Sequence, residues 1–511
     1  MSSLVKRYPN ALLYMTALLA SACLSVWINM NETVINPDGI CYLLSAKVAQ
    51  HADVNTVMHV CPQAIWPFFS MLIARLSQLT PLSLKNAALL LDTLFSMLSV
   101  VTFIAMTGVL GGSKRVMWLA AAVILLSHEF NNVRQYIVRD HGFWAFYLVS
   151  IYCLLQFSVK PGWRYALAWS ASLMLAALFR IEGVIFLLLV PGVVWFFTQT
   201  TWRKRAQLYV QLHALTLLAC VVLAIWLLIH PQQTLAKLGR VAEVPQQIQH
   251  GLGLMFTRFQ IMKAALAQNV LTADSVKEAG IVLGALLVGW YVVSVVSNLS
   301  LVYTALVLYA WFKRALQTTR EKIRIVGVYL GINLVITFGF LLEREFLSKR
   351  YLIALSLTFM LWVPFSLEKI VAQCVSRKKW VWGGLLACAL LGSAVGGIFN
   401  FGYSKRYIYD AGSWFADNVP AQASIYANDL QLMYYTRHFG EKLYQANQAF
   451  QSQSITANAA WRQYDYLAFR VTQKARDRMA ANWRDMPLKP VKVFQNKRGD
   501  RVLIYKVRQE S

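Results

Sequence analysis

The sequence predicts a polytopic α-helical membrane protein with about eleven transmembrane helices, long outer loops and a small C-terminal α/β domain. Three observations lead to this fold class. The 511-residue chain is 58% hydrophobic and only 14% charged, whereas soluble domains have about 25% charged residues. Its 49 basic residues outnumber 23 acidic ones, and many lie in short connections between apolar runs. Such runs stop after position 403, where charged residues become frequent.

This composition also limits the class of partner. The net charge of +26 would suit a nucleic-acid-binding protein, but here the basic residues separate apolar segments. That arrangement is typical of a chain whose partner is a lipid bilayer, so we expect no nucleic acid. The apolar content excludes a disordered chain, and seven scattered Cys exclude a disulfide-rich secreted scaffold.

The predicted spans are apolar runs close to the roughly 20 residues needed to cross about 30 Å of hydrocarbon. They lie at 11–28, 86–110, 116–130, 141–158, 165–180, 183–199, 207–229, 290–312, 324–342, 350–367 and 380–400. Residues 280–312 are uncharged throughout, and we expect one tilted span preceded by an interfacial or re-entrant segment. The run 165–197 must turn back at the polar Arg180-Ile181-Glu182-Gly183. We expect the first run to be an uncleaved helix rather than a signal peptide, although Lys6 and Arg7 precede it.

The basic residues predict the orientation. One set of connections contains nearly all the short-loop cations, with only Glu321 and Glu368 as acids. These cations are Lys6, Arg7, Lys114, Arg115, Lys160, Arg164, Arg203, Lys204, Arg205, Lys313, Arg314, Arg320, Lys322, Arg324, Lys369, Arg377, Lys378 and Lys379. Short basic loops stay in the cytoplasm, so we expect the N-terminus inside and the C-terminus outside.

Three outer segments are too long to be mere connectors. They are 29–85, 231–279 and the tail from 404 onward, which gives a transmembrane catalytic domain (1–403) and a soluble extracytoplasmic α/β domain (404–511). Within the first, residues 64–76 are apolar but too short to span, and predict an interfacial amphipathic helix. The tail predicts helices at 407–418 and 475–483, a strand at 424–427, and a terminal hairpin of 491–494 with 501–507.

Ionisable residues at the outer membrane face are the strongest indication of a functional site. Charged side chains in or against a bilayer are energetically unfavourable, so their presence there suggests a role in function. They are Asp38, Asp53, Asp92, Glu129, Arg134, Arg139, Asp140, His141, Arg180, Glu182, Glu343, Arg344, Glu345, Lys349 and Arg350. All except Asp92 lie in an outer loop or near an outer helix end, which predicts one shared cavity at the outer leaflet.

Each candidate also has a structural interpretation. Arg180 and Glu182 would form an internal ion pair joining the fifth and sixth spans, and Asp92 a polar bridge between helices. Asp38 would be a turn residue in Asn36-Pro37-Asp38-Gly39. The remaining charges would be interfacial: Arg139 and Asp140 reaching water, and Arg344, Lys349 and Arg350 anchoring helix ends at headgroups.

Common enzyme motifs are missing. The sequence contains no Walker loop, dinucleotide fingerprint, nucleophile elbow or His-Glu-x-x-His element. His51, His59 and Asp53 share the first outer loop, but their spacing is not diagnostic of a metal box, so a divalent metal stays open. Cys41 and Cys61 share that loop as well, and their pairing is open in an oxidising compartment.

The order of several motifs resembles the C-type-fold membrane glycosyltransferases that use polyprenyl-phosphate sugars. Relatives of that kind include the protein O-mannosyltransferases, the lipid A aminoarabinose transferase and the rhizobial lipopolysaccharide sugar transferases. The matching elements are Asp38 and Tyr42, the Cys61-Pro62 to Pro67 stretch, Arg139-Asp140-His141-Gly142, Arg180-Ile181-Glu182-Gly183, Arg350-Tyr351, and residues 414–420 (WFADNVP). Two departures concern Gly39, where some relatives have a second acid, and Gln63, where the usual element has His.

The resemblance implies transfer of a sugar from a polyprenyl-phosphate donor to an envelope acceptor, such as lipopolysaccharide, another glycan, a lipid or a protein. The site would face the outside of the inner membrane. Asp38 would be the general base, and Asp140 a second catalytic-site carboxylate that positions acceptor or donor. The implied substrate- and phosphate-binding residues are Arg139, His141, Arg180, Glu182, Arg350 and Tyr351. Two alternatives remain: a transporter or flippase of an envelope lipid or solute, and a ligase or polymerase that transfers a preassembled glycan.

Overall fold

The computed structural model describes residues 10–197, 201–229, 240–452, 455, 457–475 and 488–507. The chain divides into two compact units. The first contains Met1–Val26, Leu91–Arg134 and Arg139–Phe399, and the second contains Trp27–Leu90, Gln135–Val138 and Asn400–Ser511. The first outer loop thus belongs to the same unit as the tail. An independently folding domain at 404–511 stays a prediction.

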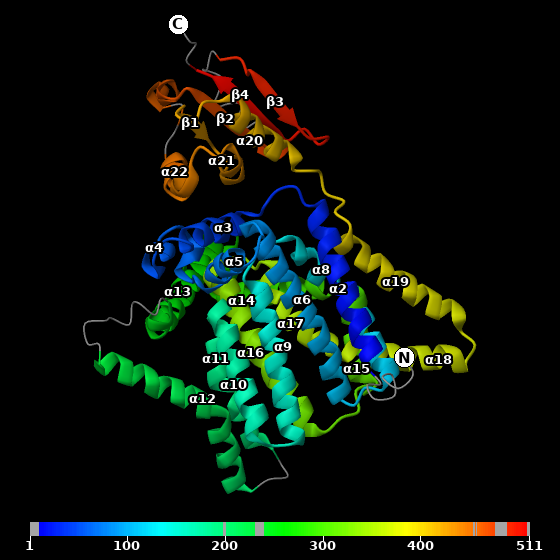
Figure 1. Ribbon diagram of the computed structural model, residues 1–511. Coiled ribbons are helices and arrows are strands. Elements are labelled where there is room, and N and C mark those ends of the chain that lie inside the picture. Colours follow the sequence, from blue (N-terminus) through cyan, green and yellow to red (C-terminus); the bar gives the residue numbers. More distant parts are fainter. Residues whose placement is uncertain are drawn as a thin grey trace. The chain divides into compact units, whose positions relative to one another are not determined.

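The protein is a polytopic helical membrane protein (Figure 1). Eight helices in the described residues are long and apolar enough to cross a membrane, or nine if a bent pair counts as one span. The single helices are α2 (Ala11–Asn31), α6 (Leu84–Val109), α9 (Asp140–Val159), α12 (Trp202–Ile229), α14 (Ala279–Leu299), α16 (Arg320–Arg344) and α19 (Trp380–Ile398). The eighth is continuous through η6 (Lys349–Leu352), α17 (Ile353–Phe359), η7 (Met360–Trp362) and α18 (Val363–Ser376). The bent pair joins α7 (Lys114–Leu125) to α8 (His128–Asn132) and η2 (Val133–Gln135) at 52°.

The two remaining predicted spans correspond to shorter helices. The span predicted at 165–180 corresponds to α10 (Trp163–Phe179). The span predicted at 183–199 corresponds to α11 (Glu182–Leu189) followed by η3 (Val190–Phe196). The chain turns between α10 and α11 where it was predicted to do so, because Arg180 has extended backbone (φ −147°, ψ 137°). Pro191, at the start of η3, lacks the amide that an uninterrupted α-helix would use there. The exact number of spans therefore stays a prediction.

The uncharged run 280–312 differs from its prediction. The long helix α14 comes first, and a short helix α15 (Leu301–Phe312) follows it. Ser300 separates them with a φ of 70°, and its hydroxyl accepts a 3.4 Å hydrogen bond from the Tyr303 amide at the start of α15. The positive φ breaks the helix, and the serine then caps the next one. Before this run lie α13 (Arg240–Asn269) and η5 (Ala273–Glu278).

A buried polar network connects the central helices of the first unit. Tyr147 of α9 pairs with Thr358 of α17 at 2.9 Å and accepts from Asn333 of α16 at 2.7 Å. The hydroxyl of Tyr329 on α16 contacts Ser150 of α9 at 2.9 Å and accepts from Trp169 of α10 at the same distance. Within a bilayer the hydrophobic effect contributes little to helix association, because the lipid tails are as apolar as the helix surfaces. Hydrogen bonds such as these therefore help to determine which helices pack together.

The second unit combines the first outer loop with the tail. The loop forms α3 (Pro37–Ala49), α4 (Val54–Met58), η1 (Pro62–Ile65) and α5 (Phe68–Leu79). The tail contains α20 (Arg406–Asn418), β1 (Ile425–Ala427), α21 (Leu430–Thr436), η8 (Gly440–Lys442), α22 (Leu443–Ser452), η9 (Ala457–Gln463), β2 (Tyr466–Val471), η10 (Gln473–Ala475), β3 (Lys492–Gln495) and β4 (Arg501–Lys506) (Figure 1).

The tail contains a small mixed sheet of order β1-β2-β4-β3. β1 is parallel to β2, and β2–β4 and β4–β3 are antiparallel, so the predicted α/β character and terminal hairpin are confirmed. The helix predicted at 407–418 and the strand at 424–427 are also confirmed, as α20 and β1. The helix predicted at 475–483 lies largely outside the described residues.

Candidate active site

A buried ion-pair cluster joins three helix ends in the first unit. Asp140 is in the first turn of α9, Arg180 follows α10, and Glu182 begins α11. The guanidinium of Arg180 pairs with both carboxylates, and its Nε donates to Glu182 Oε1 at 2.9 Å. The side chains of Arg180, Asp140 and Glu182 are only 11%, 4% and 7% exposed, respectively. Both acids also lie at helix N-termini, where the helix dipole stabilises negative charge.

Two glycines allow these helix ends to meet. A Cβ atom on Gly142 would lie 2.4 Å from the ring of Phe179, and one on Gly183 would lie 2.5 Å from the backbone nitrogen of Ala177. Neither distance leaves room for a methyl group, so α9 and α11 can approach the end of α10 only with glycine at both positions. Helix packing therefore explains the glycine that ends each of the two charged motifs, Arg139-Asp140-His141-Gly142 and Arg180-Ile181-Glu182-Gly183.

Aromatic and cationic side chains surround the cluster. The Tyr351 ring lies 4.7 Å from the Arg180 guanidinium, 5.3 Å from that of Arg350 and 5.6 Å from that of Arg344. Arg344 also donates a 3.0 Å hydrogen bond to the Tyr351 hydroxyl. Arg139 and Arg350 both attract the Asp140 carboxylate electrostatically. Guanidinium groups thus outnumber carboxylates around one aromatic ring, an environment that favours an anionic ligand.

A second ion-pair cluster involves η6, the short helix that also carries Arg350 and Tyr351. Lys349 of η6 places its Nζ 2.5 Å from Glu129 Oε1, and Glu129 itself is 2% exposed. The neighbouring His128 ring lies 3.5 Å from the same oxygen. Consecutive residues of η6 therefore reach both clusters: Lys349 pairs with Glu129, whereas Arg350 and Tyr351 lie by the Arg180 cluster.

Asp38 belongs to the second unit, in the first turn of α3. It is half-buried, and its Oδ1 accepts a 2.8 Å hydrogen bond from Gln63 Nε2 on η1. A disulfide between Cys41 and Cys61, with Cα atoms 5.9 Å apart, joins α3 to the residue that precedes η1. The pairing that the sequence left open is therefore present. Asp38 is a helix N-terminal residue rather than the turn residue of the structural interpretation.

The other candidates have protein contacts. His141 is 1% exposed, with its ring nitrogens 3.4 Å from Ser96 Oγ and 3.2 Å from the Val133 carbonyl oxygen. Asp53 is exposed and caps α4 by accepting a 3.1 Å hydrogen bond from the Thr56 amide. Within the described ranges, no three His, Cys, Asp or Glu side chains form a group that could hold a metal ion.

Sequence reasoning missed several residues beside Asp38. Gln63 was noted only as a departure from the resembled motif, and the tail residues Gln431, Tyr435 and Tyr444 were not singled out at all. Their side chains contact the backbone just before or at the start of α3. A hydrogen bond between residues about 400 positions apart has no local sequence signal, so hydropathy and spacing could not have found them.

The fold is that of membrane glycosyltransferases, as comparison with solved structures establishes. One structure of the archaeal oligosaccharyltransferase from Archaeoglobus fulgidus, tethered to an acceptor peptide, matches with a TM-score of 0.56 and 13% identity over 99% of this chain and 75% of that one. A second structure, of AglB from the same organism in complex with an inhibitory peptide and a dolichol-phosphate, matches with a TM-score of 0.55 and 13% identity over 91% and 70%. The similarity extends over nearly the whole chain, and the fold implied by the sequence motifs is confirmed.

A third structure, ArnT from Cupriavidus metallidurans bound to undecaprenyl phosphate, matches with a TM-score of 0.46 and 12% identity over 98% of each chain. No protein-family model matches the sequence. No curated protein matches it either.

Proposed function

We propose that the chain is a glycosyltransferase that moves a sugar from a polyprenyl-phosphate donor to an envelope acceptor. The observation that carries the proposal is the buried Arg180–Asp140–Glu182 cluster, with Arg139 and Arg350 beside it, in a chain of this fold. The archaeal structure holds dolichol-phosphate, which is a lipid phosphate of the same chemical class. Arginine side chains suit such a ligand, because their planar fork can bind two phosphate oxygens at once.

The proposed reaction needs one base and a stabilised leaving group. The acceptor oxygen attacks the anomeric carbon of the sugar, the bond from that carbon to the phosphate oxygen breaks, and the lipid phosphate leaves. The Asp38 carboxylate takes the proton of the acceptor hydroxyl, a contribution typically worth about 10²–10⁴ in rate. Phosphate is already a good leaving group, so the paired acid and base of a glycosidase are not required.

The cations then have distinct roles in the proposal. Arg139 and Arg350 bind the phosphate, with Tyr351 beside them. A substrate-binding role for the buried His141 stays a prediction. Arg180 is occupied by Asp140 and Glu182. It therefore acts mainly by holding Asp140 in place, so that Asp140 can position acceptor or donor. Direct contact between Arg180 and phosphate stays a prediction, and the use of a divalent metal stays open.

The proposed location is the inner membrane, with the site facing the periplasm. Two observations support it. The first outer loop and the tail belong to one compact unit, which favours placing both on the same side of the membrane. That unit contains the Cys41–Cys61 disulfide, and disulfides persist in oxidising compartments such as the periplasm rather than in the cytosol.

A second candidate function is transfer of a preassembled glycan. It is favoured by the name of the archaeal enzyme, an oligosaccharyltransferase. Mass spectrometry of envelope glycans, lipids and proteins, from cells with and without this chain, separates the candidates. Loss of one sugar residue from a product supports the single-sugar transferase, and loss of a longer chain supports the ligase. An unchanged set of covalent products, with lipid or solute accumulating on one side, supports the transporter.

Asp38→Asn tests the proposed base in the same assay. The variant is expressed in cells that lack this chain, and the rate at which it restores the glycan missing from those cells is measured. We expect that rate to be about 10²–10⁴-fold lower than with the unmodified chain. Asp410→Asn is the matched control, because Asp410 is a surface acid of the same unit, 41% exposed, paired with Arg406 on α20. Turnover by Asp38→Asn equal to that of the control would remove Asp38 from this role.

A further inference from the structure

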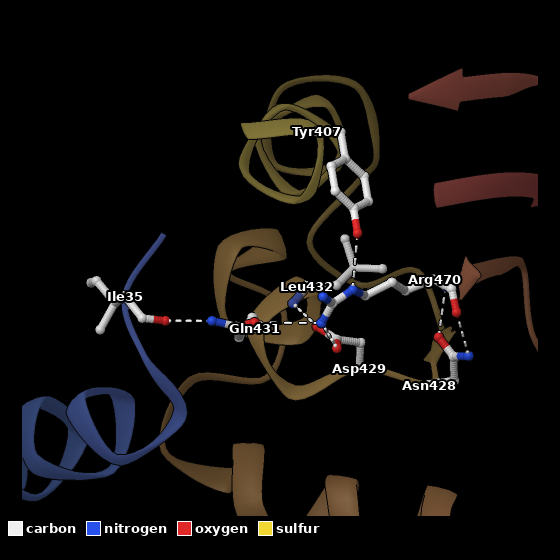
Figure 2. Close-up of polar contacts among 7 residues, drawn as sticks. All are labelled: Ile35, Tyr407, Asn428, Asp429, Gln431, Leu432 and Arg470. Carbon is white, nitrogen blue, oxygen red and sulfur yellow. Dashed lines mark hydrogen bonds and ion pairs between the residues drawn. The ribbon is translucent and has the colours of Figure 1, made fainter. Parts of the chain in front are cut away.

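Two side chains of α21 bind both backbone polar groups of Ile35, three residues before Asp38. Gln431 Nε2 donates a 2.7 Å hydrogen bond to the Ile35 carbonyl oxygen, and the Ile35 amide donates a 2.8 Å bond to the Tyr435 hydroxyl. Figure 2 shows Gln431 pointing from α21 toward Ile35. Ile35 lies in the irregular segment between α2 and α3 and is 9% exposed. Its backbone groups therefore rely on these side chains rather than on water.

A third bond lies one residue before Asp38. The Tyr444 hydroxyl of α22 donates to the Pro37 carbonyl oxygen at 3.1 Å. Pro37 is the first residue of α3, so this bond holds the start of the helix that carries Asp38. We call Gln431, Tyr435 and Tyr444 the loop clamp. Its three hydrogen bonds all go to main-chain atoms, so they fix the path of the chain rather than recognise particular loop side chains.

The helix that carries most of the clamp is itself anchored to the sheet. Asp429 caps α21 by accepting a 3.0 Å bond from the Leu432 amide. The same carboxylate accepts from Arg470 Nη1 at 2.6 Å, and Arg470 Nε donates to the Tyr407 hydroxyl of α20 at 3.2 Å (Figure 2). Arg470 Nη1 also lies 3.5 Å from Gln431 Oε1. Burial alone would lower the pKa of Arg470, but its interactions with Asp429 and Tyr407 together raise the pKa, so the anchor stays charged.

We propose that the loop clamp positions Asp38 for catalysis. Gln431, Tyr435 and Tyr444 are then positioning residues that act through the main chain of Ile35 and Pro37, and the tail contributes to the chemistry without contacting substrate. The inference rests on the proposed role of Asp38 as the general base. Its physical reason is that displacing a catalytic group by about 1 Å can reduce a rate by about 10²-fold.

Hydroxyl deletions test the clamp in the full-length chain. Tyr435→Phe and Tyr444→Phe each remove one hydrogen bond and no ring packing. Such a bond typically contributes about 0.5–1.5 kcal/mol, so each variant should restore the missing glycan about 2- to 10-fold more slowly. The double variant should be about 4- to 100-fold slower, the product of the two single effects. Tyr434→Phe is the matched control: Tyr434 is adjacent on α21 and half-buried, and its hydroxyl has no hydrogen-bond partner in the part of the chain that the structure describes.

A double-mutant comparison separates positioning from general damage to the tail. If the clamp acts through Asp38, adding Tyr435→Phe and Tyr444→Phe to Asp38→Asn should reduce the residual rate by less than twofold, because effects within one functional unit are not additive. If the clamp only stabilises the fold, the two losses should multiply, and the proposal is overturned. Equal turnover by the double Phe variant and Tyr434→Phe would overturn it as well.

Amide exchange gives a readout that does not depend on the reaction. In Tyr435→Phe the Ile35 amide loses its acceptor, so deuterium uptake in a peptide covering 32–40 should rise, whereas Tyr434→Phe should leave it unchanged. Raised uptake with Asp38→Asn fully active would show that the clamp holds the loop but that Asp38 is not the base, so the proposed mechanism fails while the contact stands. Unchanged uptake in Tyr435→Phe would contradict the clamp itself and leave the proposed function untouched.

Discussion

Gln63 donates a 2.8 Å hydrogen bond to the carboxylate of Asp38, from a short helix attached by a disulfide to the helix that carries the acid. The glutamine stands where the resembled motif has a histidine. An amide can donate to a carboxylate but does not exchange its proton with it at ordinary pH. Gln63 therefore orients Asp38 without competing for the proton that Asp38 is proposed to take.

Replacing Gln63 should slow transfer. A hydrogen bond to a charged group typically contributes about 1.5–3 kcal/mol, so Gln63→Leu should lower turnover by about tenfold or more. The measurement is the rate at which the variant restores the missing envelope glycan. Gln78→Leu is the control, because Gln78 lies in the same outer loop, on α5, and its amide has exposed partners: it donates to the Gln50 carbonyl and accepts from Arg75. Equal rates in the two variants would show that Gln63 is a packing residue.

Breaking the disulfide should destabilise the second unit. The bridge closes a loop of 20 residues, and a loop of this size contributes about 3 kcal/mol in the chain-entropy account. The double replacement Cys41→Ser and Cys61→Ser should therefore lower the unfolding midpoint and expose 41–63 to limited proteolysis. Cys374→Ser, which alters a free and partly exposed cysteine, should change neither. An unaltered midpoint in the double variant would mean that the helices α3 and η1 hold together without the bond.

Arg180 should be important first for stability. Arg180→Met leaves two buried carboxylates without their cation, and breaking such a pair costs about 3–5 kcal/mol. Adding Asp140→Asn and Glu182→Gln removes the uncompensated charges, so most of the thermal stability should return. Transfer should stay lost in that triple variant if the cluster is catalytic, and recover if Arg180 is only an internal ion pair. Arg115→Met, which removes a more exposed pair with Glu368, should shift stability by about 0.5 kcal/mol or less.

Glu32 should make stability depend on pH. It follows α2, and burial raises the pKa of its carboxyl, although Lys405 and Lys85 oppose the shift. The folded protein thus holds the proton more tightly than the unfolded chain. The stabilisation that comes from this tighter proton binding is complete at pH values below the pKa of Glu32 in the unfolded chain. It is lost as the pH rises through the pKa of Glu32 in the folded protein. Between pH 4 and pH 8, the unfolding temperature should therefore fall less for Glu32→Gln than for the unmodified chain. Asp417→Asn, at an exposed position on α20, should behave like the unmodified chain.

The tail should lie outside the cytoplasm. The basic loops predict an outer C-terminus, and the tail shares a compact unit with the disulfide-containing first loop. Alkaline phosphatase fused after Ser511 should be active, and a green fluorescent protein fused at the same position should not be fluorescent. The reverse pattern would invert the topology and exclude the periplasmic site.

Much of the architecture could be predicted because it depends on local composition. Apolar runs gave the membrane class, and the polar Arg180–Glu182 segment marked a real break between α10 and α11. Strand and turn residues in the tail predicted its final hairpin. Boundaries inside long apolar runs were less accessible, since the break at Ser300 depends on a backbone conformation that hydropathy does not encode.

The sequence by itself determined that this chain enters a membrane and which charged residues are unusual there. Only the tertiary structure decided their partners: Arg180 with both Asp140 and Glu182, Lys349 with Glu129, and the tail with the backbone before Asp38. The physical reason is range. Hydropathy and turn preference are properties of neighbouring residues, whereas a buried ion pair or hydrogen bond depends on where helices distant in sequence place their ends.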